Sequence, residues 1–374
     1  MLFLVGASLF SSVLGGVIAY SYFFNDVYNL PCFGEIEYKN GLKPGIVIRE
    51  AKKVVVEQDV KINEIINNTQ TSIVGIFKKV KISSNKESLD NQKFSLKEFY
   101  YVKDRVGQGL VVTSDGWIMT TFNPYKNKTF NEDKFLQNYV VATKDQIYTI
   151  DKVLVDKFGP FVFLHIDTRD LPVKSFADND EILVGEEVIA VNYELSAWIT
   201  YISYYGPNKE LIKFSDENNL EIKLSNSPNK EFFGAFVFDL SGKVVAFIDS
   251  EGNIIPIDNI KNVVNSLLKY QKIKRPSLGI YYIDLQDLIR YDSNVKKGAI
   301  IYNEGKRAIV KDSVAQKAGL QKGDIIVSIN NIYIDKFNDL SSVIQDYLAG
   351  DKITITYLRG GKENNVDIIL DELK

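Results

Sequence analysis

Between Phe99 and about Ser250 the sequence consists of short runs rich in Val, Ile, Phe and Tyr, separated at short intervals by turn-forming residues. The separating stretches include "SDG" at 114–116, "DND" at 178–180 and "SPN" at 227–229. Such residues tolerate the backbone angles of tight turns, and apolar runs of this length between them are typical of strands. The pattern therefore predicts a mainly β domain, either a barrel or a sandwich.

Composition excludes several classes of protein. The net charge is -3, and Lys, Asp and Glu are interspersed along the 374 residues, so no basic face for nucleic acid is predicted. Cys32 is the single cysteine and cannot form an internal disulfide, and no Cys/His cluster is available to hold zinc. We therefore expect no metal and no cofactor. A chain of this length and 45% hydrophobic content is expected to form two or three domains.

The N-terminus carries an uncharged run of 23 residues, Leu2 to Phe24. This length is sufficient to cross a bilayer as a helix. We predict a single-pass membrane anchor over residues 1–25, a linker or helical segment over 26–60, and the remainder of the chain outside the cytoplasm. The alternative is a helix buried within the soluble part, which would have to be covered on every face.

A helix and a domain boundary are predicted near residue 270. Between Ile257 and Tyr270, apolar residues recur at helical spacing, and "KIKRP" at 272–276 interrupts the pattern. We therefore place the β domain at 61–272 and a second, α+β domain at 273–374.

The second domain contains a predicted binding groove. In "RPSLGIYYIDL", a tight loop precedes a strand, and glycine in such a loop lets successive backbone N–H groups converge on an anion such as a carboxylate. Further on, "FNDLSSVIQDYLAGDK" predicts a short helix with Asn338 or Asp339 as its N-cap and Gly350 as its stop. The candidate peptide-binding residues are Ser277, Leu278, Gly279, Ile280, Tyr281 and Tyr282 on the loop and strand, and Leu340, Val343, Ile344 and Tyr347 on the helix.

These motifs, with "AGLQKGDIIVSINN" and "ITITYLRGGK", resemble a PDZ domain in their order. The resemblance implies that a peptide C-terminus adds beside the strand after Ile280 and that the loop amides hold its carboxylate. The alternative is a PDZ domain that only packs on its neighbour.

The whole chain resembles the HtrA/DegS family of trypsin-fold serine proteases. "GQGLVVTSDGWIMTT" is similar to the family's stretch that ends in T-N-N-H, and "FFGAFVFDLSGKVVAF" is similar to its S-G-G-A-L run. "GNIIPIDNI" resembles the run before the family's linking helix. The resemblance implies a trypsin-like double β-barrel followed by one PDZ domain.

The resemblance also places the three catalytic positions, and none carries the expected residue. The histidine falls on Asn123, the aspartate on Pro160 and the serine on Phe233. A triad needs a nucleophile, a base and a carboxylate that orients the base, and these three side chains supply none of them. Where the family has P-G-N-S, this chain has "KEFF", with Glu231 at the oxyanion glycine. We therefore predict that the catalytic site is degenerate.

Other catalytic arrangements are weaker predictions. The one histidine, His165, lies in the strand-like run "FVFLHIDT" and is expected to be structural and remote from Asn123. A Ser227/Lys230 dyad is a formal alternative, although turn capping explains the serine better.

Two functions remain open. The first is a membrane-anchored, catalytically inactive HtrA-like pseudoprotease whose PDZ domain binds exposed C-terminal tails of envelope proteins as a scaffold, sensor or adaptor. The second is an active serine endopeptidase of the envelope. The resemblance further implies a homotrimer, for which Phe99, Tyr100 and Tyr101 lie at the appropriate place, or assembly with an active relative.

Overall fold

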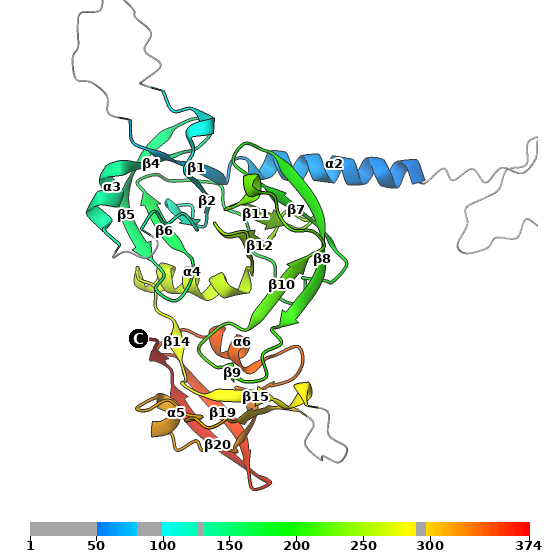
Figure 1. The fold of residues 1–374 in the computed structure, drawn as a ribbon, viewed down its shortest axis with the longest axis vertical. Coiled ribbons are helices and arrows are strands. Elements are labelled where there is room, and N and C mark those ends of the chain that lie inside the picture. Colours follow the sequence, from blue (N-terminus) through cyan, green and yellow to red (C-terminus); the bar gives the residue numbers. More distant parts are fainter. Residues whose placement is uncertain (1–50, 81–98, 126–129, 289–296) are drawn as a thin grey trace, which may run out of the picture. The chain divides into compact units, whose positions relative to one another are not determined.

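The computed structural model describes residues 51–80, 99–125, 130–288 and 297–374 (Figure 1). The predicted anchor at 1–25 and Cys32 lie outside these residues. Within the described part of the chain, no helix has the length and apolar character needed to cross a membrane. The first described element is helix α2 (Ala51–Thr69), in which Ile65 is buried in the core of the following domain.

The first six strands form a closed antiparallel barrel in the order β1-β2-β3-β6-β5-β4. Strands β2 and β3 pair antiparallel and are joined by the predicted turn at Gly116, whose φ is +110°. A short helix, α3 (Glu132–Asn138), precedes β4. The strands are β1 (Ile73–Lys78), β2 (Gly107–Val111), β3 (Trp117–Thr120), β4 (Tyr139–Ala142), β5 (Ile147–Val155) and β6 (Val162–Ile166).

A second sheet of six strands has the order β10-β8-β7-β11-β12-β13. Its end strands β10 and β13 lie next to each other, so the sheet is curved like a barrel (Figure 1). The prediction of a mainly β domain with barrel-like sheets is therefore confirmed. The strands are β7 (Glu187–Val191), β8 (Ala197–Pro207), β10 (Leu220–Leu224), β11 (Phe236–Phe238), β12 (Val244–Ile248) and β13 (Ile254–Pro256).

Helix α4 (Asp258–Tyr270) follows as predicted from its apolar spacing. Its residues Ile260, Val263 and Leu267 are buried in the core of the second sheet, whereas Leu268 is 50% exposed. The apolar stripe is thus narrower than the sequence pattern indicated. Gln271 ends the helix in the left-handed conformation, with φ of 53°.

The C-terminal domain has its own core and a sheet in the order β20-β19-β17-β16-β15-β9. Its last member, β9 (Lys213–Phe214), belongs in sequence to the preceding domain, between β8 and β10. The other elements are β14 (Pro276–Ser277), β15 (Tyr281–Asp284), β16 (Ala299–Ile301), α5 (Val314–Lys317), β17 (Ile325–Ile329), β18 (Ile332–Tyr333), α6 (Leu340–Gln345), β19 (Lys352–Arg359), β20 (Lys362–Ile369) and β21 (Asp371–Glu372).

Candidate functional site

The predicted groove of the C-terminal domain is framed by strand β15, helix α6 and the loop that precedes β15. Gly279 in this loop has φ of +81°, and a Cβ at that position would lie 2.5 Å from Cβ of Ser313. Only glycine therefore fits there without a shift of the neighbouring segment. Asp339 is the N-cap of α6, and its side chain accepts a hydrogen bond from the N–H of Ser341. Both features agree with the sequence prediction.

A segment of the same chain lies along this groove. Strand β9 pairs antiparallel with β15, so that Phe214 is opposite Tyr281 and Lys213 is opposite Tyr282. The N–H of Ser215 donates to the carbonyl oxygen of Ile280 at 2.9 Å, and the N–H of Ile280 donates to Oγ of Ser215 at 3.0 Å. We call residues Lys213–Asp216 the groove segment.

The loop amides hold the carboxylate of Asp216. Its Oδ1 accepts hydrogen bonds from the N–H groups of Leu278 at 2.8 Å and Gly279 at 2.9 Å, and Oδ2 accepts one from Oγ of Ser277 at 2.6 Å. Oγ of Ser215 also donates to Oδ1, at 2.6 Å. Asp216 is buried, and hydrogen bonds of this number make a buried carboxylate stable without a cation.

The other end of the groove segment is held by a buried charge. Lys213 is 1% exposed, and its Nζ lies 3.3 Å from Oδ1 of Asp339 and 3.2 Å from Oδ2 of Asp287. Burial lowers the pKa of Lys213, but these two carboxylates outweigh that effect and hold the pKa above its usual value. The lysine is therefore charged at neutral pH, and it connects the segment to the N-terminus of α6.

Two further polar groups complete this network. Oη of Tyr282 donates to Oδ2 of Asp339 at 2.6 Å, and burial, followed by the charge of Asp339, raises the pKa of this tyrosine well above its usual value. Nδ2 of Asn219, just beyond the groove segment, donates to Oη of Tyr282 and to Oγ of Ser341.

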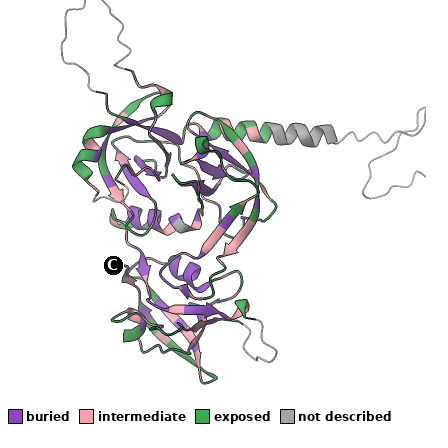
Figure 2. Cartoon of the chain, in the orientation of Figure 1, coloured by how far each residue is buried: buried purple, intermediate pink, exposed green. Residues whose placement is uncertain are grey.

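Helix α6 is buried along its whole length. All six of its residues are buried, including Ser341, Ser342 and Gln345, and Figure 2 shows the helix uniformly in the colour of buried residues. The groove between α6 and β15 is thus filled by the chain's own residues.

The three positions predicted to be degenerate triad positions lie in the first domain. Phe232 is 3% exposed and packs beside Trp198, with ring centroids 6.0 Å apart. The ring of Phe233 is half-buried and lies over Gly252, where an added Cβ would be 2.8 Å from the ring. Residues Lys230–Phe232 form the 3-10 turn η3, and the N–H of Phe233 donates to the carbonyl of Lys230 within it.

Asn123 and Pro160 occupy ordinary structural positions. Oδ1 of Asn123 accepts a hydrogen bond from the N–H of Tyr125, which closes a local turn. Pro160 is exposed in the turn between β5 and β6. His165 lies on β6, where Nδ1 is 2.7 Å from Oδ1 of Asp151 and the ring packs edge-on against Trp117.

The model of the PDZ domain family matches residues 276–370. A probable periplasmic serine endoprotease, DegP-like, from Hahella chejuensis is 28% identical over 295 residues, which are 71% of this chain and 57% of that protein. The serine protease Do-like HtrA of Lactococcus lactis is 25% identical over 58% of this chain and 59% of its own length. The chain therefore spans slightly more than half the length of these curated relatives.

The solved structures agree on the fold. HtrA-type protease AlgW with decapeptide covers 84% of this chain and 99% of its own, at a TM-score of 0.51 and 18% identity. The chain is therefore similar to HtrA-type proteases in sequence and in fold. It combines a trypsin-type fold with one C-terminal PDZ domain, as the sequence predicts.

In this chain, the candidate peptide-binding residues of the loop and of β15 contact the groove segment. Ser277, Leu278, Gly279 and Ile280 contact it through the hydrogen bonds given above, and Tyr281 stacks on Phe214 with ring centroids 4.6 Å apart. On α6, Leu340, Val343 and Ile344 belong to the PDZ core, whereas Tyr347 lies beyond the helix and accepts from Nδ2 of Asn330.

Sequence reasoning missed the groove segment itself. "KFSD" is short, and "GPN" at 206–208 marked the surrounding stretch as a turn-rich connection. The one available signal was that Leu211, Ile212 and Phe214 are apolar in an otherwise polar stretch between two strands.

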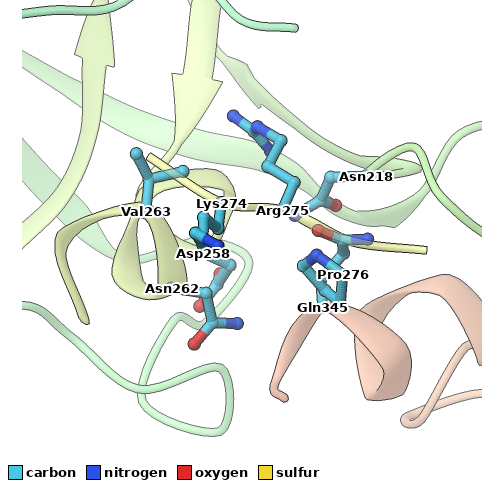
Figure 3. Close-up of a pocket in the computed structure, with 8 residues that line it drawn as sticks. All are labelled: Asn218, Asp258, Asn262, Val263, Lys274, Arg275, Pro276 and Gln345. Atoms are coloured by element: carbon cyan, nitrogen blue, oxygen red, sulfur yellow. The ribbon is translucent and has the colours of Figure 1, made fainter. Parts of the chain in front are cut away.

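A pocket lies where α4, α6 and the linker to the PDZ domain meet. Figure 3 shows Gln345 of α6 beside Pro276 of β14, with Asp258 and Asn262 of α4 and Asn218 on its other sides. Nε2 of Gln345 has no hydrogen-bond partner in the described structure. The described residues contain no group of three or more His, Cys, Asp or Glu side chains arranged to hold a metal ion.

Proposed function

We propose that this HtrA-like protein is a catalytically inactive, membrane-anchored pseudoprotease that acts through peptide binding by its PDZ domain. Its ligands are C-terminal tails of extracytoplasmic proteins, and its role is that of a scaffold, sensor or adaptor in envelope protein quality control. The trypsin-type domain acts as a scaffold for the PDZ domain and does not catalyse hydrolysis.

The environment of Phe233 is the main support for the proposed absence of catalysis. A hydrolase of this fold needs a hydroxyl at this position and a free N–H pointing at the developing oxyanion. The ring of Phe233 instead packs on Gly252, and its N–H is used within the η3 turn by the carbonyl of Lys230. The exposed Glu231 lies in the same turn, and its negative charge opposes an oxyanion.

The peptide-binding half rests on the loop amides of Leu278 and Gly279, which converge on a carboxylate. The PDZ family match over residues 276–370 supports the same reading. A peptide that adds beside β15 would present its terminal carboxylate at these two amides.

A fluorophosphonate probe tests the absence of catalysis. We expect no covalent labelling of the full chain in detergent, with an active HtrA protease as the positive control. Labelling of any serine, Ser227 included, would favour the alternative function, an active serine endopeptidase of the envelope.

A peptide screen tests the PDZ half. We expect some peptides with free C-termini to bind the full chain and to lose binding when the terminus is an amide. Equal binding of acid and amide forms would remove the proposed role of the loop amides.

The location and assembly are part of the same proposal. The relatives named as periplasmic support an extracytoplasmic position, with residues 1–25 as the anchor. Phe99 is 49% exposed, which is compatible with a homotrimer or with assembly beside an active relative. Light scattering of the detergent-solubilised chain distinguishes a monomer from these assemblies.

A further inference from the structure

We propose that the groove segment, Lys213–Asp216, is an internal ligand of the PDZ domain, and that an incoming peptide C-terminus binds by displacing it. The inference rests on the peptide-binding function proposed above. It adds what the peptide competes with and which terminal sequences compete best.

The carboxylate of Asp216 stands in for a peptide terminus. Its Oδ1 accepts hydrogen bonds from the N–H groups of both Leu278 and Gly279, which are the donors proposed to hold a peptide's terminal carboxylate. Since one carboxylate fills these donors, a second cannot bind until Asp216 leaves. The two ligands are mutually exclusive at this point.

The backbone of the segment also occupies the place of a peptide strand. Ser215 is the last residue that pairs through its own N–H, which donates to the carbonyl of Ile280. A terminal residue in the place of Ser215 would make the same hydrogen bond and would put its α-carboxylate close to the position that the Asp216 side chain now occupies. The residue two positions earlier in the peptide would then take the place of Lys213.

This alignment predicts the ligand's sequence. The site of Lys213 is faced by the carboxylates of Asp339 and Asp287, with Asp284 also nearby and with the hydroxyl of Tyr282 bound to Asp339. An uncompensated group of carboxylates favours a cation. Peptides with Lys or Arg two residues before the terminal residue should therefore bind best, with an aromatic residue between them to stack on Tyr281 as Phe214 does.

The chemistry of the contact is suited to exchange. Lys213, Ser215 and Asp216 are buried and polar, and their hydrogen bonds would be replaced one for one by those of a peptide. Release therefore leaves no unpaired group in the groove once the peptide is bound.

The test compares Asp216→Ala with Glu217→Ala in the full chain in detergent. Glu217 is the exposed neighbour of Asp216 and serves as the matched control. The probe is the peptide Leu-Ile-Lys-Phe-Ser, the sequence of residues 211–215, with a free C-terminus, and two comparison peptides carry a C-terminal amide or Glu in place of Lys.

Asp216→Ala should bind the probe about tenfold or more tightly than the wild type, because the groove is then open in a larger fraction of molecules. Glu217→Ala should bind as the wild type does, and the Glu-containing peptide should bind the opened groove at least about tenfold more weakly than the probe. Equal affinity of Asp216→Ala and the wild type for the probe would overturn the proposal.

Hydrogen exchange of residues 278–282 separates this proposal from the peptide-binding function. Asp216→Ala should exchange faster there than Glu217→Ala. Faster exchange with no binding of any peptide to either protein would support the internal contact and reject the peptide-binding function. Unchanged exchange would overturn the internal contact.

Discussion

At the scale of single residues, charge decides what the groove holds. The buried carboxylate of Asp216 is held by four hydrogen bonds. The buried ammonium group of Lys213 is paired with the carboxylates of Asp339 and Asp287. Neither fact can be read from the sequence, because Asp216 and its partner Leu278 are 62 residues apart and nothing local distinguishes this aspartate from the others.

Lys213→Met should lower the free energy of unfolding by about 3–5 kcal/mol, because it leaves Asp339 buried and without its cation. The matched control is Lys223→Met, which removes an exposed pair with Glu221 and should change it by less than about 1 kcal/mol. Urea unfolding measures both.

The pH dependence of the stability lost on Lys213→Met follows from the direction in which the pKa of Lys213 is shifted. The pKa of Lys213 is raised in the folded chain, so its stabilisation is complete below the unfolded value of 10.5 and is lost as the pH rises through the folded value. The loss on Lys213→Met should be the same between about pH 6 and 9. A loss that changed across this window would contradict the assigned pairing.

Restoring the three catalytic side chains should not restore catalysis. The variant Asn123→His, Pro160→Asp, Phe233→Ser keeps Lys230 and Glu231, so the amide of residue 233 still donates into the η3 turn. We expect no fluorophosphonate labelling and no casein cleavage. Stoichiometric labelling would mean that the turn does not block the oxyanion site.

At the scale of elements, the sequence predicted well what local patterns determine. The α4 helix, the Asp339 cap of α6 and the glycine loop before β15 each follow from residues within a few positions of one another. Strand β9 escaped prediction because two residues cannot show a period, and its pairing is with a strand of another domain.

Gly279→Ala tests the loop that presents the amides. The φ of Gly279 is +81°, and a Cβ added there would lie 2.5 Å from Cβ of Ser313. A methyl group at this position must therefore displace the loop or the segment that carries Ser313. Gly305→Ala is the control, since Gly305 also has positive φ, +62°, but has open space around it. We expect a loss of about 1 kcal/mol for the control and clearly more for Gly279→Ala in thermal unfolding. Equal losses would show that the close approach to Ser313 carries no cost.

At the scale of the molecule, the sheet of the PDZ domain includes a strand from the trypsin-type domain. A second link joins Arg275, at the entry to the PDZ domain, to Asp156 before the β5–β6 turn, with Nε and Oδ1 3.2 Å apart. The sequence predicted each domain because their motifs are contiguous. It could not predict how the domains contact each other, because those contacts join residues more than 60 positions apart.

A reversible disulfide across the filled groove tests the central claim most directly. Phe214 and Tyr281 face each other across β9 and β15, a separation that suits a disulfide. In a chain carrying Cys32→Ser, Phe214→Cys and Tyr281→Cys, binding of a peptide with a free C-terminus should be absent when the pair is oxidised and should return on reduction, at an affinity lowered by the loss of Tyr281. Equal binding in both states would contradict the claim that the groove segment occupies the peptide's place.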